Sequence, residues 1–312
     1  MSRLRLLTIL VPLLAVGSAL GAQVAQVAQV AQVAPVTPNC PSCAEWNAPQ
    51  APFKLVGNTF YVGTHGLTAL LITSPSGHIL IDGGLMESAP LIAANIRTLG
   101  FRLEDVRVLL NTHVHYDHAG GLAALQRLSG AEVYASVPSV PVLQQGTVGR
   151  DDPQFGIATP IEAVARVRAI PANDTVRLLP LVVRALHTAG HTPGGTSWTW
   201  TSCEGSRCLE LVYADSQSPI SADDFRFTAS TTYPRALADF AAGFAALEGV
   251  RCDVLITPHP DASGLWERVA KRDAGEADAL RDATACTRYA ETARERLAKR
   301  VAAERAQSGR TP

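Results

Sequence analysis

The sequence carries almost no net charge and has no block of basic residues. Lys and Arg number 27 against 28 Asp and Glu, which gives a formal net charge of −1. Binding to the phosphates of nucleic acid requires a basic patch, so we expect no nucleic-acid partner. No Ser-x-x-Lys arrangement surrounds a plausible serine nucleophile, and the sequence therefore does not support a covalent serine mechanism.

The sequence also lacks a convincing membrane-spanning run. The apolar stretch at residues 6–16 is short for a bilayer-spanning helix, follows Arg3 and Arg5, and precedes several small residues. This layout predicts a secretory signal peptide over residues 1–21 that is cleaved on export. We therefore expect a periplasmic protein without a stable membrane anchor. Residues 22–45 begin with Ala-Gln-Val four times over, which predicts a low-complexity segment, and one folded domain is expected over 46–312.

Six cysteines in an exported chain indicate disulfide bonds rather than free thiols. The expected pairs are Cys203–Cys208, Cys252–Cys286 and Cys40–Cys43. The first pair flanks a turn-like sequence between two predicted strands, and the second would hold the C-terminal helix to the core. The third is a Cys-x-x-Cys, which we interpret as a small structural loop, with a redox motif as the alternative.

Short apolar runs between Gly, Asn, Ser and Pro turns predict strands at 53–56, 59–62, 68–73, 78–82, 106–110, 132–136, 175–179, 181–186, 196–201, 210–213 and 254–257. Apolar residues at helical spacing predict helices over 87–99, 119–128, 235–247, 263–271 and 279–305. Residues 146–160 show no periodicity and predict a long loop. Because strands and helices are grouped twice over, we expect an α/β fold with two packed sheets and helices outside, a sandwich of four layers.

Four side chains that can bind metal stand within six residues, directly after the predicted strand at 106–110. His113 and His115 are two residues apart and can point the same way from an extended backbone. Asp117 and His118 are offset from them and can serve a second ion. A catalytic zinc takes three protein ligands and leaves one position for water, so two such sites need two more ligands.

Two further histidines lie in Gly- or Pro-containing turns at the ends of apolar runs, namely His191 and His259. The alternative is that all these histidines are scattered structural or surface residues. The other three histidines are weaker candidates for metal ligands. We interpret His65 as a loop residue that could face the pocket, His78 as a strand-edge residue, and His187 as lying near the site rather than in it.

These motifs resemble those of the metallo-β-lactamase superfamily from about residue 46 to about residue 296, and within it the class B β-lactamases of the third subclass. Three features favour that subclass. His118 directly follows Asp117, a serine in the segment 213–218 stands where the first subclass has a cysteine ligand, and the segments 193–198 and 213–216 resemble this subclass closely. The resemblance implies an αβ/βα sandwich with two zinc ions per chain. By it, His113, His115 and His191 hold the first zinc, and Asp117, His118 and His259 hold the second.

The resemblance implies a hydrolase that opens the amide bond of penicillins, cephalosporins and carbapenems with a zinc-bound hydroxide. Asp117 would act in catalysis by accepting the nucleophile's proton, and Asp82 would steady the histidine loop from behind. The candidates for substrate binding are Ser216, Ser218, Gln154 and Phe155. The two serines could equally be ordinary turn residues.

Other hydrolases share this fold and metal set, so a lactonase or a thioesterase of the glyoxalase type remains an alternative. In many of those relatives an Asp bridges the two metals, and Asp215 could do so here. A zinc-binding envelope protein without catalysis is the non-enzymatic alternative. The chain departs from close relatives at its amino-terminal bridge, because they pair the cysteine near Cys40 with a residue in the turn that His65 occupies here, and Cys43 is extra.

Overall fold

The computed structural model describes residues 40–309. The predicted signal peptide and the Ala-Gln-Val repeat lie outside the described residues, whereas residues 40–45 belong to the compact unit. Within the described part of the chain, no helix is both long enough and apolar enough to span a bilayer.

Two sheets form the centre of the molecule. The first has seven strands that pair in chain order, β1 (Phe53–Val56), β2 (Thr59–Tyr61), β3 (Leu70–Ile72), β4 (His78–Ile81), β5 (Val106–Leu110), β6 (Glu132–Ser136) and β7 (Val167–Ile170). Its β1–β4 part is antiparallel and its β4–β7 part is parallel. The second pairs in reverse order, β12 (Val254–Ile256), β11 (Arg207–Tyr213), β10 (Thr196–Glu204), β9 (Leu181–His187) and β8 (Thr175–Leu178).

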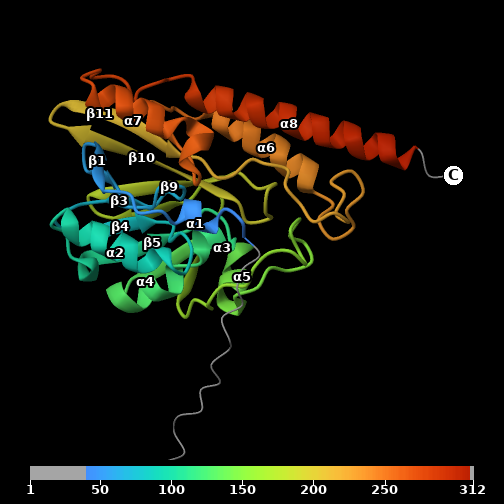
Figure 1. Cartoon of the computed structure of the whole chain (residues 1–312), viewed down its shortest axis with the longest axis horizontal. Coiled ribbons are helices and arrows are strands. Elements are labelled where there is room, and N and C mark those ends of the chain that lie inside the picture. Colours follow the sequence, from blue (N-terminus) through green and yellow to red (C-terminus); the bar gives the residue numbers. More distant parts are fainter. Residues whose placement is uncertain (1–39, 310–312) are drawn as a thin grey trace, which may run out of the picture. The chain divides into compact units, whose positions relative to one another are not determined.

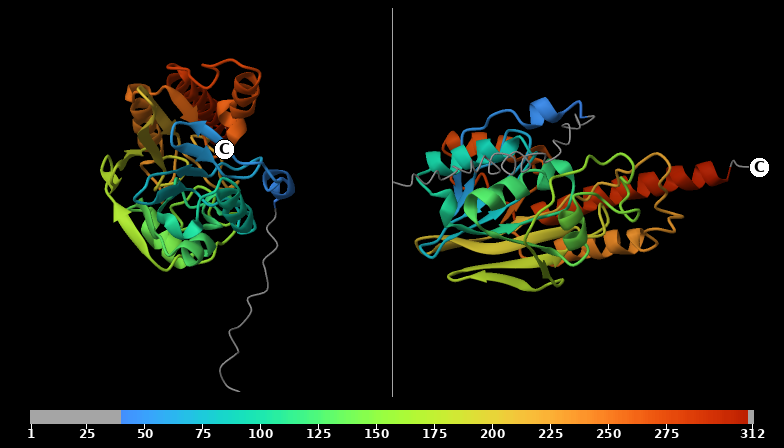
Figure 2. Two further views of the ribbon diagram at one scale, coloured as in Figure 1. Left: turned by 90° about the vertical axis from the view of Figure 1, so that its left-hand side faces the viewer. Right: turned by 90° about the horizontal axis from the view of Figure 1, so that it is seen from below.

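Helices cover the outer faces of both sheets (Figure 1). Those on the first sheet are α2 (Ser88–Thr98), α4 (Leu122–Ser129) and α5 (Ser139–Gln145), and those on the second are α6 (Ala236–Gly249) and α8 (Ala285–Ser308). Figure 2 shows the same layers end-on, with the strands between the two groups of helices. The predicted four-layer α/β sandwich is confirmed.

Alternation along the strands places the core between the sheets. In β9, Leu181, Val183 and Ala185 are buried, while Val182 and Arg184 are exposed, as expected for a strand that packs on one face. The inner faces of both sheets meet in one apolar cluster that contains the largest buried aromatic side chains, Trp198, Tyr61 and Tyr213. The short helix α7 (Leu265–Asp273) closes the edge of this cluster through Leu265 and Trp266.

Several helices and strands were not predicted or have bounds that differ from the predicted ones. Strand β7 and helix α5 were not predicted, and the short helix α1 (Cys43–Trp46) falls in the segment predicted as low-complexity. The last helix begins at Ala285 rather than 279, because the Asp282 carboxylate accepts a hydrogen bond from the backbone N–H of Thr284 (2.9 Å) and forms a turn there.

The helix predicted over 119–128 begins at Leu122 as α4, and Gly120 and Gly121 separate it from a short preceding helix, α3 (Tyr116–Ala119). A Cβ atom at Gly121 would lie 2.2 Å from the carbonyl oxygen of Gly83. Only glycine therefore permits the backbone after β4 to approach the histidine loop this closely.

All three expected disulfides are present in the structure. Cys203 and Cys208 lie opposite each other in the β10–β11 hairpin. The Cys252–Cys286 bond joins the segment before β12 to the first turn of α8. Cys40 and Cys43 are bonded within a single turn, and His65 stacks on Trp266 with ring centroids 4.9 Å apart.

Candidate metal centre

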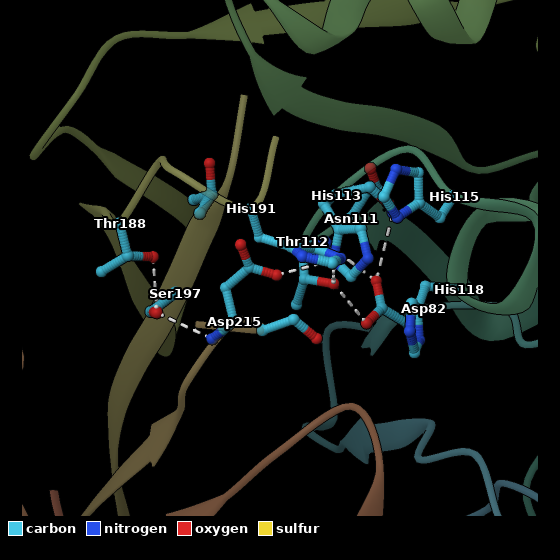
Figure 3. Close-up of polar contacts among 12 residues, drawn as sticks. Asp82, Asn111, Thr112, His113, His115, His118, Thr188, His191, Ser197 and Asp215 are labelled. Carbon is cyan, nitrogen blue, oxygen red and sulfur yellow. Dashed lines mark hydrogen bonds and ion pairs between the residues drawn. The ribbon is translucent and has the colours of Figure 1, made fainter. Parts of the chain in front are cut away.

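The histidine loop begins at the carboxyl end of β5 and is fastened there by Asp82. The Asp82 carboxylate accepts hydrogen bonds from the Thr112 backbone N–H (2.8 Å), the Thr112 hydroxyl (2.8 Å) and the Asn111 amide (3.2 Å). The Tyr213 hydroxyl donates to it from the second sheet (3.0 Å). Asp82 has a left-handed backbone, with φ of 60°, which is strained for a non-glycine residue. The structure thus places Asp82 directly behind the loop (Figure 3).

The loop and two distant turns bring the predicted metal ligands into one cluster. Ligand atoms of His113, His115 and His191 all lie within 4.8 Å of one another, as do those of His113, Asp117 and His118. All five of these residues are buried. His259 joins the second group, since its ring centroid is 4.9 Å from that of His118.

Each of the first three histidines is held by an acceptor on its outer side. The Nδ1 atom of His113 lies 2.7 Å from Asp215 Oδ1, and the Nδ1 atom of His191 lies 2.8 Å from the carbonyl oxygen of Ser218. The Nε2 atom of His115 lies 3.3 Å from both carboxylate oxygens of Asp152. Metal-binding histidines ordinarily donate their other N–H to such acceptors. The nitrogens that remain are therefore His113 Nε2, His115 Nδ1 and His191 Nε2.

The other three predicted ligands meet at one carboxylate oxygen. Asp117 Oδ2 lies 3.1 Å from His118 Nε2 and 3.2 Å from His259 Nε2. Two ligand atoms on a tetrahedral zinc lie about 3.3 Å apart, given zinc–ligand bonds of about 2.0–2.1 Å. These separations therefore fit the edges of a zinc coordination shell.

The donor set also fits a metal by its chemistry. The Nε2 atom of His113 is buried and has no hydrogen-bond partner among the described residues, although a buried polar atom ordinarily has one. Burial, followed by the charges of His118 and the other histidines, lowers the pKa of His113 well below its ordinary value. Burial likewise lowers the pKa of His191 to about 3. Both imidazoles are thus neutral at pH 7, the form that binds zinc.

Asp117 is ionised for a different reason. Burial alone raises the pKa of its carboxyl group, but the charge of His118 and hydrogen bonds from His118 and His259 outweigh burial and hold that pKa well below its ordinary value. The cluster therefore offers one carboxylate and five imidazoles, a set that suits zinc.

The predicted substrate-binding residues lie around the cluster to different degrees. Ser216 and Ser218 are half-buried after β11, and the Ser218 hydroxyl is 3.3 Å from His191 Nδ1. The Gln154 amide nitrogen is 3.5 Å from His115 Nδ1. Phe155 is exposed at the predicted long loop and lies beneath Arg150, whose guanidinium carbon is 5.3 Å from the ring centroid. The structure thus places Ser218 and Gln154 at the cluster, Ser216 with His259 in the lining of an adjoining cavity, and Phe155 in the exposed loop.

Sequence reasoning missed several contacts. No sequence pattern indicated that Asp152 contacts His115, because Asp152 lies in a loop without periodicity. Trp46, the first residue of the predicted domain, packs on His259 with ring centroids 4.9 Å apart. Of the remaining histidines, none joins the ligand groups: His65 is exposed, His78 is buried at the start of β4 and packs on Phe101, and His187 ends β9.

Comparisons with known proteins agree with this geometry. The family model of the metallo-beta-lactamase superfamily matches residues 63–208. The chain is similar to the solved structure of Rm3 metallo-beta-lactamase (51% identity, TM-score 0.84, covering 86% of this chain and 100% of that one). It is also similar to MEM-A1, a subclass B3 metallo-beta-lactamase from a soil metagenome library (51% identity, TM-score 0.82, covering 84% of this chain and 99% of that one).

Curated relatives match over shorter stretches. A hydroxyacylglutathione hydrolase of Pseudomonas paraeruginosa is 35% identical over 94 residues, which is 30% of this chain and 27% of that protein. The chain spans 30%, 50% and 58% of the length of the first three curated relatives that it matches.

Proposed function

This chain belongs to the metallo-beta-lactamase superfamily, and we propose that it is a zinc-dependent hydrolase that opens the amide bond of β-lactam antibiotics. The observation that carries the proposal is the ligand cluster, in which His113, His115 and His191 lie together and Asp117 lies beside His118 and His259. The chain is 51% identical to two metallo-beta-lactamases over nearly their whole length. Penicillins, cephalosporins and carbapenems are the proposed substrates.

We assign two zinc ions to the site. His113, His115 and His191 would hold the first, and Asp117, His118 and His259 the second. When bound, zinc polarises a carbonyl group and lowers the pKa of water to near neutrality. Two groups of three protein ligands each leave positions open, as catalytic zinc sites do.

The chain's own residues supply positioning and proton transfer. Asp117 is an ionised, buried carboxylate whose Oδ2 atom is fixed by two imidazoles. It can orient the attacking water and accept its proton. Ser216 and Ser218 can donate hydrogen bonds to the substrate carboxylate from the edge of the site. Gln154 and Phe155 can contact the substrate from the loop that follows α5.

The position of Asp215 favours this activity over lactonase or thioesterase chemistry. The resemblance implies that lactonases and thioesterases of this fold carry an Asp that bridges the two metals. Here Asp215 contacts the outer nitrogen of His113 instead, with its Oδ1 atom 2.7 Å from Nδ1. A zinc-binding envelope protein without catalysis would need no open positions, and the two three-ligand groups argue against it.

Export to the periplasm is part of the proposal. The amino-terminal signal over residues 1–21 and the low-complexity segment that precedes the domain at 46–312 are assigned from the sequence alone. Three disulfides with no free cysteine among the described residues support an oxidising compartment. Hydrolysis of β-lactams there would confer antibiotic resistance.

The decisive experiment is a hydrolysis panel of a penicillin, a cephalosporin, a carbapenem, a lactone and a thioester, each with and without a chelator. We expect turnover of the β-lactams that the chelator abolishes and added zinc restores, with two zinc ions per chain in the active protein. Preferential turnover of the lactone or the thioester would assign the alternative hydrolases, and bound zinc without any turnover would assign the envelope protein.

A further inference from the structure

A cavity of about 390 Å³ adjoins the metal centre on the side of α8. Its lining includes His259, Ser216 and Ser218 on one side and Tyr289, Arg288 and Arg296 of α8 on the other. The volume falls in the range of about 300–1,000 Å³ that is typical of small-molecule sites. A single carboxylate group held by the two serines would occupy only a small part of it. The cavity therefore has room for a further substituent of the substrate.

The cavity exists because small side chains face it from two elements. Thr292 and Ala293 line it from α8, and Ala262 and Ser263 line it from the 3-10 turn Pro260–Ser263. A larger side chain at these positions would fill the space next to the metal centre.

Tyr289 fixes the distance between α8 and the serine-bearing segment. Its hydroxyl donates to the carbonyl oxygen of Asp215 (3.1 Å) and accepts from the backbone N–H of Gln217 (3.3 Å). The wall of the cavity is thus held to the same segment that supports His113. A substituent bound in the cavity would therefore lie in a fixed position relative to the zinc ligands.

The charge of the cavity is positive. Arg288 is neutralised by Asp282, with which it makes an ion pair. Arg296, by contrast, makes no hydrogen bond or ion pair with any residue in the described range 40–309. No Asp or Glu is among the described residues that line the cavity. One guanidinium group is therefore available to an anion that enters from the metal centre.

We propose that this cavity binds the substituent on the carboxylate-bearing ring of the substrate, and that Arg296 favours substituents that carry a second negative charge. The inference rests on the proposed β-lactam hydrolysis and adds to it a preference among substrates. A guanidinium group donates charge-assisted hydrogen bonds to a carboxylate in a bidentate arrangement, whereas it gains much less from a neutral amide.

The test uses two cephalosporins that differ only at the end of the C3 substituent, a carboxylate in one and a carboxamide in the other. For Arg296→Ala we expect kcat/KM on the carboxylate substrate to fall about two- to fivefold, mainly through KM, as for an exposed charge pair. The value on the carboxamide should change less than twofold. Arg296→Lys should retain only part of the preference, because it keeps the positive charge but cannot make the bidentate hydrogen bonds of a guanidinium group.

Lys299→Ala is the matched control, since it removes the same charge from the exposed face of α8 outside the cavity. It should leave both substrates unchanged. Equal losses on both substrates in Arg296→Ala would place Arg296 at the ring carboxylate that they share, and unchanged rates would remove it from the site; either result overturns the inference. Wild-type protein that opens neither substrate would instead refute the proposed function, and the inference with it.

Discussion

The hydrogen bond between Asp215 and His113 allows a sharp test of how the chain prepares a metal ligand. Both side chains are buried, with exposed fractions of 0% and 1%. Asp215 Oδ1 is 2.7 Å from His113 Nδ1, and the backbone N–H of Asp215 donates to the Ser197 hydroxyl (2.8 Å). Asp215→Ala removes the acceptor while leaving the backbone that positions it.

The expected loss of zinc affinity in Asp215→Ala can be derived in two ways. A buried N–H without a partner costs about 1–3 kcal/mol, which corresponds to roughly five- to 150-fold at about 1.4 kcal/mol per tenfold change. Removal of an outer partner of a metal-binding histidine costs about 10–100-fold in metal affinity or activity. Because the two ranges overlap, we expect zinc affinity at the first site to fall about 10–100-fold. Asp215→Asn keeps an acceptor oxygen and should lose less.

The assay is competition for zinc with a chromophoric chelator, together with zinc content per chain and kcat at saturating zinc. Asp253→Ala is the control. Its carboxylate is also buried and accepts a backbone hydrogen bond, from Glu210 N–H (3.0 Å), but it precedes β12, whereas His259 follows that strand. It should lower the melting temperature and leave zinc affinity unchanged. Asp215→Ala protein that binds both zinc ions with wild-type affinity would refute the reasoning.

Three further predictions concern other parts of the chain. Asp117→Asn should lower kcat about a hundredfold to ten-thousandfold, whereas Ser216→Ala should mainly raise KM by an amount equivalent to about 0.5–1.5 kcal/mol. Steady-state kinetics on one carbapenem measures kcat and KM of both variants. Near-normal kcat with two zinc ions bound in Asp117→Asn would contradict the role of Asp117. The Cys252–Cys286 bond closes a separation of 34 residues, so a double alanine variant should lose about 3–4 kcal/mol of unfolding free energy in urea titration, whereas an unchanged midpoint would exclude this contribution. Burial alone raises the pKa of Glu304, but hydrogen bonds from Phe227, Thr228 and Arg300 outweigh burial and lower that pKa. The ionised Glu304 carboxylate therefore stabilises the folded protein above the unfolded pKa near 4.3, and this stabilisation is lost as the pH falls. Glu304→Gln should therefore destabilise the protein by about 1–3 kcal/mol at pH 7 and by less below pH 4, and a difference that does not depend on pH would contradict this.

The metal cluster could be predicted because most of its ligands are close in the sequence. His113, His115, Asp117 and His118 occupy one loop after a buried strand, so their proximity follows from chain geometry. The fold was accessible for a similar reason, since alternating and helical apolar patterns are local. Helix α5 was not predicted because it is short and contains Pro141 in its first turn. The first turn of a helix tolerates proline, but the proline obscures the helical spacing of apolar residues in the sequence.

The outer partners could not be predicted, because no local pattern specifies them. Asp152 reaches His115 from a loop without periodicity. His191 is held by the backbone carbonyl of Ser218, an atom that every residue possesses. The sequence left open whether Asp215 bridges the two metals, and its contact with His113 Nδ1 could not be predicted from it.

These hydrogen-bond partners also show that residues of both sheets position the site. Asp82 follows a strand of the first sheet and receives the hydroxyl of Tyr213 from the second. Asp215, two residues after β11 of the second sheet, contacts His113, three residues after β5 of the first. The indole N–H of Trp198 donates to the carbonyl oxygen of Asn111 in the same way (3.1 Å). Because the bonds that join the sheets also orient the histidine loop, the proposed zinc ions would stabilise the packing of the sheets, and a mutation that disturbs this packing would displace the ligands.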